Sequence, residues 1–271
     1  MTNSKFKTNP YNEFNKLISS SDIINILKKY NINDFSVRNL DLYQRAFVHT
    51  SYTKLKDYES FTNPGNCLEL FDKSYETLEF LGDSIIGNII SLYLYNRYYI
   101  IHNQDEGFLT KLKIRLVNGE QLSEFSKHIK LYDFLIISKH IQENCEGKEN
   151  INLLEDIFEA FIGALYLDTN SYELVSDFLI NLIETHIDFS DLILNDNNYK
   201  DQILRFFQHK FLVNPLYKTT KYEDKNMFEC SICQSFDNKE KIISSGSGVT
   251  KKKAEQEAAK NALIYYQVLN K

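Results

Sequence analysis

Apolar residues recur at every third or fourth position over most of the first 187 residues, which is the spacing of amphipathic helices. The pattern predicts helices within residues 12–30, 75–99, 109–129 and 153–167. Ser21 is the expected N-cap of the first helix, and Asp22 places a carboxylate in its first turn. Turn-forming residues around Pro64 and Gly147 interrupt the helical pattern. This part of the chain is therefore expected to be all-α.

The pattern changes after residue 187. A helix is predicted over 199–211, strands over 217–223, 227–235 and 239–248, and a last helix over 251–267. We therefore expect an N-terminal extension (1–20), an all-α domain (21–187), a linker (188–197) and a small α+β domain of order α-β-β-β-α (198–268).

Composition narrows the class of protein. No run of about 18 uncharged apolar residues occurs, so neither a transmembrane helix nor a membrane partner is expected. The polar N-terminus lacks the apolar region of a signal peptide, and the four cysteines form no regular framework. An intracellular, cytoplasmic protein is expected.

The net charge of −6 hides an uneven distribution. Residues 199–271 carry 13 Lys and Arg against 8 Asp and Glu (+5), and residues 1–198 carry 18 against 29 (−11). An acidic body joined to a basic tail domain indicates two separate tasks.

Three carboxylates lie in one predicted helix, in the segment YETLEFLGDS (75–84). At about 100° per residue, Glu79 and Asp83 fall within about 60° of Glu76. Phe80 and Gly87 lie beside the acids. The opposite, apolar side gathers Leu78, Leu81, Ile85, Ile89 and Leu92. The helix is therefore expected to bury one stripe and to present an acidic one.

The segment EDIFEAFIGALYLD (155–168) repeats this design, with Asp156, Glu159 and Gly163 on one face. Its opposite stripe, which includes Phe158, Phe161 and Leu165, is expected in the core. If two such helices pack closely, their carboxylates share a site that is unstable unless a cation fills it. Oxygen ligands without His or Cys favour Mg²⁺ or Mn²⁺. Acids on helical faces are more often simply solvated, and the pattern alone leaves that alternative open.

These segments resemble the ribonuclease III family. TLEFLGDSIIG (77–87) resembles its signature, N-E-R-L-E-F-L-G-D-S, and EDIFEAFIGALYLD resembles its second acidic motif. AFVHTSY (46–52) is similar to its upstream histidine segment, and GFLTKLKIRLVN (107–118) to the helix between the acidic motifs. Together the matches follow the family's order over roughly residues 20–185, which is more specific than any single motif.

The resemblance implies that residues 21–187 form an all-α catalytic, ribonuclease III-like endonuclease domain that homodimerises. The four metal-binding catalytic acids of the family match Glu79, Asp83, Asp156 and Glu159. Glu76 matches a further glutamate near the catalytic site, and Phe80 the aromatic that plugs into the partner subunit. The implied cofactor is Mg²⁺, with Mn²⁺ able to substitute.

The chain departs from the family pattern in two places. Tyr75 and Thr77 replace the usual Asn and Arg of the signature, which changes the polar contacts beside the acids. Residues 53–74 are longer than the family's usual connection. None of the four catalytic acids is lost.

GSGVTKKKAEQEAAKNAL (246–263) resembles the end of a double-stranded-RNA-binding domain. The expected RNA-binding residues are Thr250, Lys251, Lys252 and Lys253 at a helix N-terminus, where ammonium and free N–H groups meet phosphates, and Gln202 of the preceding helix. Leu204 and Arg205 replace the usual Gln-Glu pair, and YEDKNMF (222–228) lacks the usual Gly-x-x-His. Binding is therefore expected to depend strongly on lysine–phosphate pairs and on salt.

The expected function is that of an endoribonuclease that cleaves double-stranded RNA by two-metal-ion hydrolysis. Family behaviour implies 5′-phosphate and 3′-hydroxyl ends with short 3′ overhangs. The alternative is a catalytically weak or inactive protein that binds and sequesters double-stranded RNA on the same scaffold.

Overall fold

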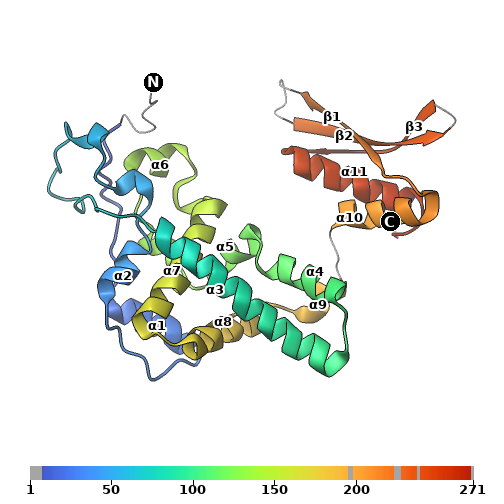
Figure 1. The fold of residues 1–271 in the computed structure, drawn as a ribbon. Coiled ribbons are helices and arrows are strands. Elements are labelled where there is room, and N and C mark those ends of the chain that lie inside the picture. Colours follow the sequence, from blue (N-terminus) through green and yellow to red (C-terminus); the bar gives the residue numbers. More distant parts are fainter. Residues whose placement is uncertain (1–7, 195–197, 223–226, 237–238, 270–271) are drawn as a thin grey trace. The chain divides into compact units, whose positions relative to one another are not determined.

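The computed structural model describes residues 8–194, 198–222, 227–236 and 239–269. The chain divides into two compact units, Met1–Leu192 and Ile193–Lys271 (Figure 1). Within the described residues, no helix combines the length and the apolar character needed to cross a membrane.

The first unit is all-helical, as predicted. Its α-helices are α1 (Ser20–Lys29), α2 (Leu40–Arg45), α3 (Glu76–Leu94), α4 (Glu106–Leu116), α5 (Gly119–His128), α6 (Lys139–Asn144), α7 (Ile151–Thr169) and α8 (Tyr172–His186). A further helix, α9 (Phe189–Leu194), begins in this unit and ends two residues past its boundary. A π-helical turn, η3 (Tyr95–Ile100), extends α3, and short 3₁₀ turns are η1 (Thr50–Tyr52), η2 (Lys56–Tyr58), η4 (Leu131–Phe134) and η5 (Gly147–Glu149).

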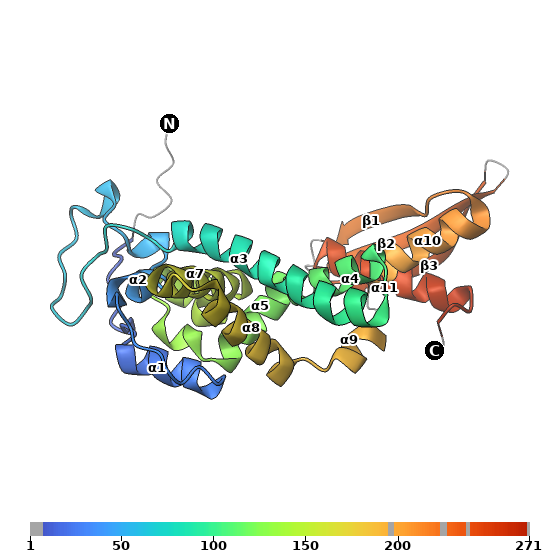
Figure 2. The ribbon, with the colours of Figure 1, turned by 60° about the horizontal axis from the view of Figure 1, so that its bottom comes forward.

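Helix α7 is the centre of this unit, because α2, α3, α5 and α8 all pack against it (Figures 1 and 2). Its Phe158, Phe161 and Leu165 are fully buried, which confirms the predicted apolar stripe. The Phe161 ring centroid lies 5.9 Å from that of Tyr43 in α2 and 6.1 Å from that of Phe178 in α8. Aromatic contacts of this kind contribute much of the apolar area that a core buries.

The N-cap of the first helix is Ser19, two residues before the expected Ser21. The Ser19 side chain accepts a hydrogen bond from Asp22 N (3.2 Å), and Asp22 Oδ2 accepts one from Ser19 N (2.9 Å). This reciprocal capping box needs an acidic residue three positions after the cap, and Ser21 has Ile24 there. The prediction of Ser21 as N-cap was therefore wrong, and residues 12–18 precede the helix.

Two further expectations need correction. The helix predicted over 109–129 is two helices, because Asn118 caps α5 by accepting a hydrogen bond from Gln121 N at 3.0 Å. Leu92, expected in the core, is 50% exposed. It lies in an open pocket between α3 and α8, together with Ile89 and Ile180, where neighbouring side chains do not close over it.

Helix α9 occupies most of the segment expected to be a linker. Phe189 is buried, with its ring centroid 5.9 Å from that of Tyr93 and the guanidinium of Arg97 4.5 Å above it. The beginning of that segment therefore packs on the helical unit, and residues 195–197 lie outside the described residues.

The long segment 53–74 and the described part of the N-terminal extension are packed parts of the first unit. Thr53 forms a parallel bridge with Phe71, and the Tyr52 hydroxyl donates to Leu68 O at 2.9 Å. Tyr52 belongs to a small apolar cluster with Val48 and Ile136, and Leu17 of the extension packs against this cluster. The buried side chain of Asn12 donates to Ile137 O at 3.1 Å. These contacts attach both segments to the rest of the first unit.

The second unit has the predicted order, α10 (Tyr199–Phe211), β1 (Leu216–Tyr222), β2 (Met227–Phe236), β3 (Lys239–Gly248) and α11 (Lys251–Tyr265). The strands form an antiparallel sheet of order β1-β2-β3, and both helices cover one face of it (Figure 1). Gly246 lets β3 touch α11, since a Cβ there would lie 2.2 Å from Ala258 N. The predicted α+β fold is confirmed.

Candidate active site

Two glycines allow α3 and α7 to cross at backbone contact. A Cβ at Gly82 would lie 1.8 Å from the carbonyl oxygen of Glu159, and a Cβ at Gly163 would lie 2.3 Å from that of Leu78. No side chain fits at either distance, so each helix requires glycine where the other passes. The sequence pattern indicated Gly163 but missed Gly82, which lies on the buried side of its helix.

The crossing brings together the four acids that the sequence singled out. Glu79 and Asp83 project from α3, and Asp156 and Glu159 from α7. Asp83 is exposed, Glu79 and Asp156 are half-buried, and Glu159 is only 8% exposed. The carboxylates of Asp83, Glu79 and Asp156 all repel that of Glu159, which places the four in one site.

Crowding and burial disfavour the charged forms of these acids. Burial, followed by repulsion from Asp83 and other neighbouring carboxylates, raises the pKa of Glu159 to about 8. Burial, followed by repulsion from Asp156 and Glu76, raises the pKa of Glu79 to about 7. Both shifts indicate a site whose full negative charge needs a compensating cation.

A fifth carboxylate, Glu155, belongs to the same site. It repels the carboxylates of Glu159 and Glu79, and its own pKa is raised by burial and by Asp156. Its side chain packs on Gly119 at the start of α5, where a Cβ would lie 2.3 Å from Glu155 Oε2. Sequence reasoning missed Glu155, although two consecutive acids open the second motif.

Glu76 lies at the edge of the acidic site. It is exposed, and its Oε2 accepts a hydrogen bond from the Ser74 hydroxyl at 2.9 Å. Its charge raises the pKa of Glu79 and of Asp156, so it influences the site electrostatically. His49, half-buried nearby, has its pKa lowered by burial and raised in part by Glu76.

The two residues that depart from the family signature both make defined contacts. The Tyr75 hydroxyl donates to Asp156 Oδ2 at 2.7 Å. The Thr77 hydroxyl accepts a hydrogen bond from the Arg45 guanidinium at 2.9 Å. Arg45 from α2 thereby brings a positive charge to the first turn of α3.

The donor set fits a hard divalent cation. Every candidate ligand is a carboxylate, two of them have strongly raised pKa values, and oxygen ligands without His or Cys suit Mg²⁺ or Mn²⁺. In the part of the chain that is described, no three His, Cys, Asp or Glu side chains are already arranged to hold one ion.

Phe80 lies on α3 next to Glu79 and is 78% exposed. The helical pattern placed it away from the core, and the structure agrees. Most of the other large apolar side chains of α3 are buried or half-buried, so Phe80 stands out on this helix as an exposed apolar side chain.

In the second unit, Thr250 caps α11 by accepting a hydrogen bond from Lys253 N at 3.2 Å. The first turn of α11 carries three exposed lysines, Lys251, Lys252 and Lys253. Lys251 Nζ lies 3.9 Å from Glu255 Oε1. The structure therefore brings Thr250 and the three lysines together as predicted. Residues 223–226, where the usual strand-loop motif was found missing, lie outside the described residues.

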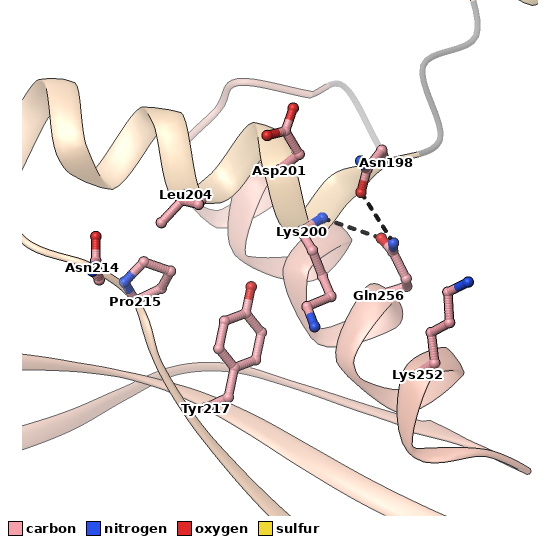
Figure 3. A pocket seen from close by; sticks show the side chains of 9 residues that line it. All are labelled: Asn198, Lys200, Asp201, Leu204, Asn214, Pro215, Tyr217, Lys252 and Gln256. Carbon is pink, nitrogen blue, oxygen red and sulfur yellow. Dashed lines mark hydrogen bonds between the residues drawn. The ribbon is translucent and has the colours of Figure 1, made fainter. Parts of the chain in front are cut away.

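Figure 3 shows a pocket that joins the starts of α10 and α11. The Gln256 side chain of α11 accepts a hydrogen bond from Lys200 N (3.1 Å) and donates one to Asn198 Oδ1 (3.2 Å). A side chain of α11 therefore caps the N-terminus of α10. Lys252 and Leu204 line this pocket, but Gln202 does not. The N-termini of the two helices therefore lie side by side with Lys252 on the rim.

Comparison with known families finds two matches. The model of the ribonuclease III domain matches residues 76–170, and that of the double-stranded RNA binding motif matches residues 199–266. The first match spans the crossing helices α3 and α7, and the second spans the α10-to-α11 fold.

Comparison with individual proteins finds relatives along most of the chain. Ribonuclease 3 of Borreliella burgdorferi is 32% identical over 88% of this chain and 89% of its own length. The probable ribonuclease 3 of Acanthamoeba polyphaga mimivirus is 34% identical over 96% of this chain, which spans only 47% of that longer protein. Among solved structures, the nuclease domain of ribonuclease III from Campylobacter jejuni aligns with a TM-score of 0.47 at 27% identity, covering 61% of this chain and 98% of that domain.

Proposed function

Because the chain belongs to the ribonuclease III family, we propose that it is an endoribonuclease that hydrolyses double-stranded RNA with divalent metal ions. The observation that carries this proposal is that four carboxylates lie in one site where α3 crosses α7: Glu79, Asp83, Asp156 and Glu159. A separate unit with the double-stranded RNA binding fold supplies a means of holding the duplex.

The four acids would hold Mg²⁺, with Mn²⁺ able to substitute. Bound metal supplies charge that makes a water molecule more acidic and stabilises a departing oxygen. The protein's part is to hold the carboxylates on two rigid helices, so that little reorganisation is needed. Glu159, the most buried of the four, faces the lowest local polarity, where its interaction with a cation is strongest.

We further propose that the products carry 5′-phosphate and 3′-hydroxyl ends, with the 3′ oxygen as leaving group. Each subunit of a homodimer would cut one strand and leave a short 3′ overhang, as the family resemblance implies.

The test is to incubate the purified chain with a long RNA duplex, with and without Mg²⁺, and to sequence the ends. We expect cleavage only with Mg²⁺ or Mn²⁺, no cleavage of single-stranded RNA, and ends that accept ligation at the 5′-phosphate. Tight binding of the duplex without cleavage in either metal would contradict nuclease activity and favour the sequestering alternative.

Substitution of Phe80 by Ala is expected to weaken self-association. Phe80 is 78% exposed on a helix whose other large apolar residues are mostly covered, so we propose that a second subunit buries it. Loss of one anchoring aromatic at an interface costs about 2 kcal/mol or more, so the dimer dissociation constant should rise at least about 30-fold. Sedimentation velocity over a concentration series measures this. Phe14→Ala, at a Phe that is 67% exposed outside α3, should leave the dimer intact.

Replacing Lys252 and Lys253 together by Ala is expected to weaken duplex binding and its dependence on salt. Both lysines are exposed beside a helix N-terminus, where they can pair with phosphates. Each lost lysine–phosphate contact should reduce the slope of log affinity against log salt by about 1. Fluorescence anisotropy at several salt concentrations measures the slope. The charge-matched pair Lys28→Ala and Lys29→Ala, exposed at the end of α1, should change neither quantity.

A further inference from the structure

The hydroxyl of Tyr75 makes a contact that the local helix does not need. Tyr75 is the N-cap residue of α3, but its side chain caps no backbone N–H group of that helix. Its backbone already anchors the chain, since its N–H donates to Val48 O at 2.9 Å and its carbonyl accepts from Leu78 N at 2.7 Å. The hydroxyl instead reaches α7 and donates to Asp156 Oδ2 at 2.7 Å.

Asp156 depends on this contact. Among the described residues, Tyr75 is its one hydrogen-bond donor, although the carboxylate is half-buried and lies among other acids. A hydrogen bond to one carboxylate oxygen stabilises the ionised form and restricts rotation of the group. With Oδ2 held, Oδ1 remains available for another partner.

Tyr75 itself cannot easily move. Its side chain is 2% exposed, and its ring centroid lies 5.9 Å from that of His49, which is held in turn by the hydroxyl of Ser51 at 2.8 Å. Hydrogen-bonding partners that fix the orientation of a metal ligand commonly change metal affinity by about 10- to 100-fold. A rigid donor of this kind has the properties of such a partner.

We propose that Tyr75 is a positioning residue that orients Asp156 for divalent metal binding, an inference that rests on the proposed metal-dependent nuclease activity. Tyr75 holds Oδ2 and so leaves Oδ1 for the metal site shared with Glu79 and Glu159. The family signature usually has Asn here, so this device distinguishes the chain from relatives that keep the usual residue.

The test is Tyr75→Phe in the full chain, which removes one oxygen atom and keeps the buried ring. Mn²⁺ binding without RNA is followed by the electron paramagnetic resonance signal of free Mn²⁺. We expect the apparent Mn²⁺ dissociation constant to rise about 10-fold. The Mg²⁺ concentration for half-maximal cleavage should rise in parallel, while duplex affinity without divalent metal stays unchanged.

Two controls separate positioning from a general structural effect. Tyr52→Phe removes a buried hydroxyl that donates to Leu68 O, away from the acids, and should leave Mn²⁺ affinity unchanged. In an Asp156→Asn background, Tyr75→Phe should cause no further loss of Mn²⁺ affinity, because its target is already altered. A further loss of equal size would show that Tyr75 acts elsewhere and would overturn the inference.

The outcomes distinguish this inference from the proposed function. If the wild-type chain binds Mn²⁺ and cleaves duplex RNA while Tyr75→Phe is indistinguishable from it, only the role of Tyr75 is wrong. If the wild-type chain neither binds Mn²⁺ nor cleaves, the nuclease proposal fails and the inference falls with it.

Discussion

Replacing Asp83 by Asn or Glu159 by Gln is expected to reduce duplex-RNA cleavage by roughly 10²–10³-fold or more, the loss seen when one group that stabilises a transition state is removed. Each change removes a negative charge from the site where α3 crosses α7. Single-turnover cleavage at saturating Mg²⁺ measures the effect. Either variant cleaving as fast as wild type would show that the metal ligands are assigned wrongly.

The Glu159→Gln variant should gain stability while it loses activity. In the folded state, burial and neighbouring carboxylates raise the pKa of Glu159 from its ordinary value of 4.5 to about 8. The folded protein therefore keeps a proton that the unfolded chain releases, so without metal this group costs stability increasingly as pH rises from about 4.5 to about 8. Glutamine removes that cost. Thermal unfolding across this pH range in EDTA should show a flatter profile for the variant.

Matched substitutions at acids outside the site provide the control. Glu173 and Asp41 are exposed in the first turns of α8 and α2. Glu173→Gln and Asp41→Asn change the charge by the same amount but should retain wild-type cleavage. A large loss in these variants would point to overall charge instead of the acidic site.

Much of the candidate site could be predicted from helical periodicity. Glu79 and Asp83 are four residues apart and Asp156 and Glu159 three apart, so each pair shares a helix face whatever the rest of the chain does. The burial of Phe158 and Phe161 follows from the same periodicity. The second unit could be recognised because its helix and strand patterns occur in a characteristic order.

The contacts between elements could not be predicted in this way. Gly82 and Tyr75 owe their importance to their contacts with α7, which is distant in sequence. A periodic pattern on one helix carries no information about where its partner helix lies. Leu92 was expected in the core because periodicity assumes a neighbour along the whole helix, but it lies in an open pocket. The beginning of the expected linker became a helix because Phe189 finds a buried place against Tyr93 and Arg97.

Substitution of Gly82 by Ala is expected to be the most damaging single change to the fold. The new Cβ would lie 1.8 Å from the carbonyl oxygen of Glu159, a backbone atom that can yield only if α3 and α7 separate. Overpacking of a well-packed core lowers the free energy of unfolding by about 1–3 kcal/mol and sometimes more. Because the clash here is with a backbone atom, we expect a loss at or above the upper end of that range. Separation of the helices would also move Glu79 away from Glu159, so metal binding should be lost with stability.

Gly87→Ala is the matched control for Gly82→Ala on the same helix. A Cβ at Gly87 would meet only Lys113 Nζ, at 3.9 Å, so no clash arises. Since Ala is favoured over Gly in a helix interior by about 1 kcal/mol, this variant should be as stable as wild type or slightly more stable. Urea unfolding of both variants at one protein concentration, with the oligomeric state checked by chromatography, measures the difference. Equal stability of the two variants would mean that α3 and α7 do not meet at Gly82, because only a close crossing there makes the two glycines unequal.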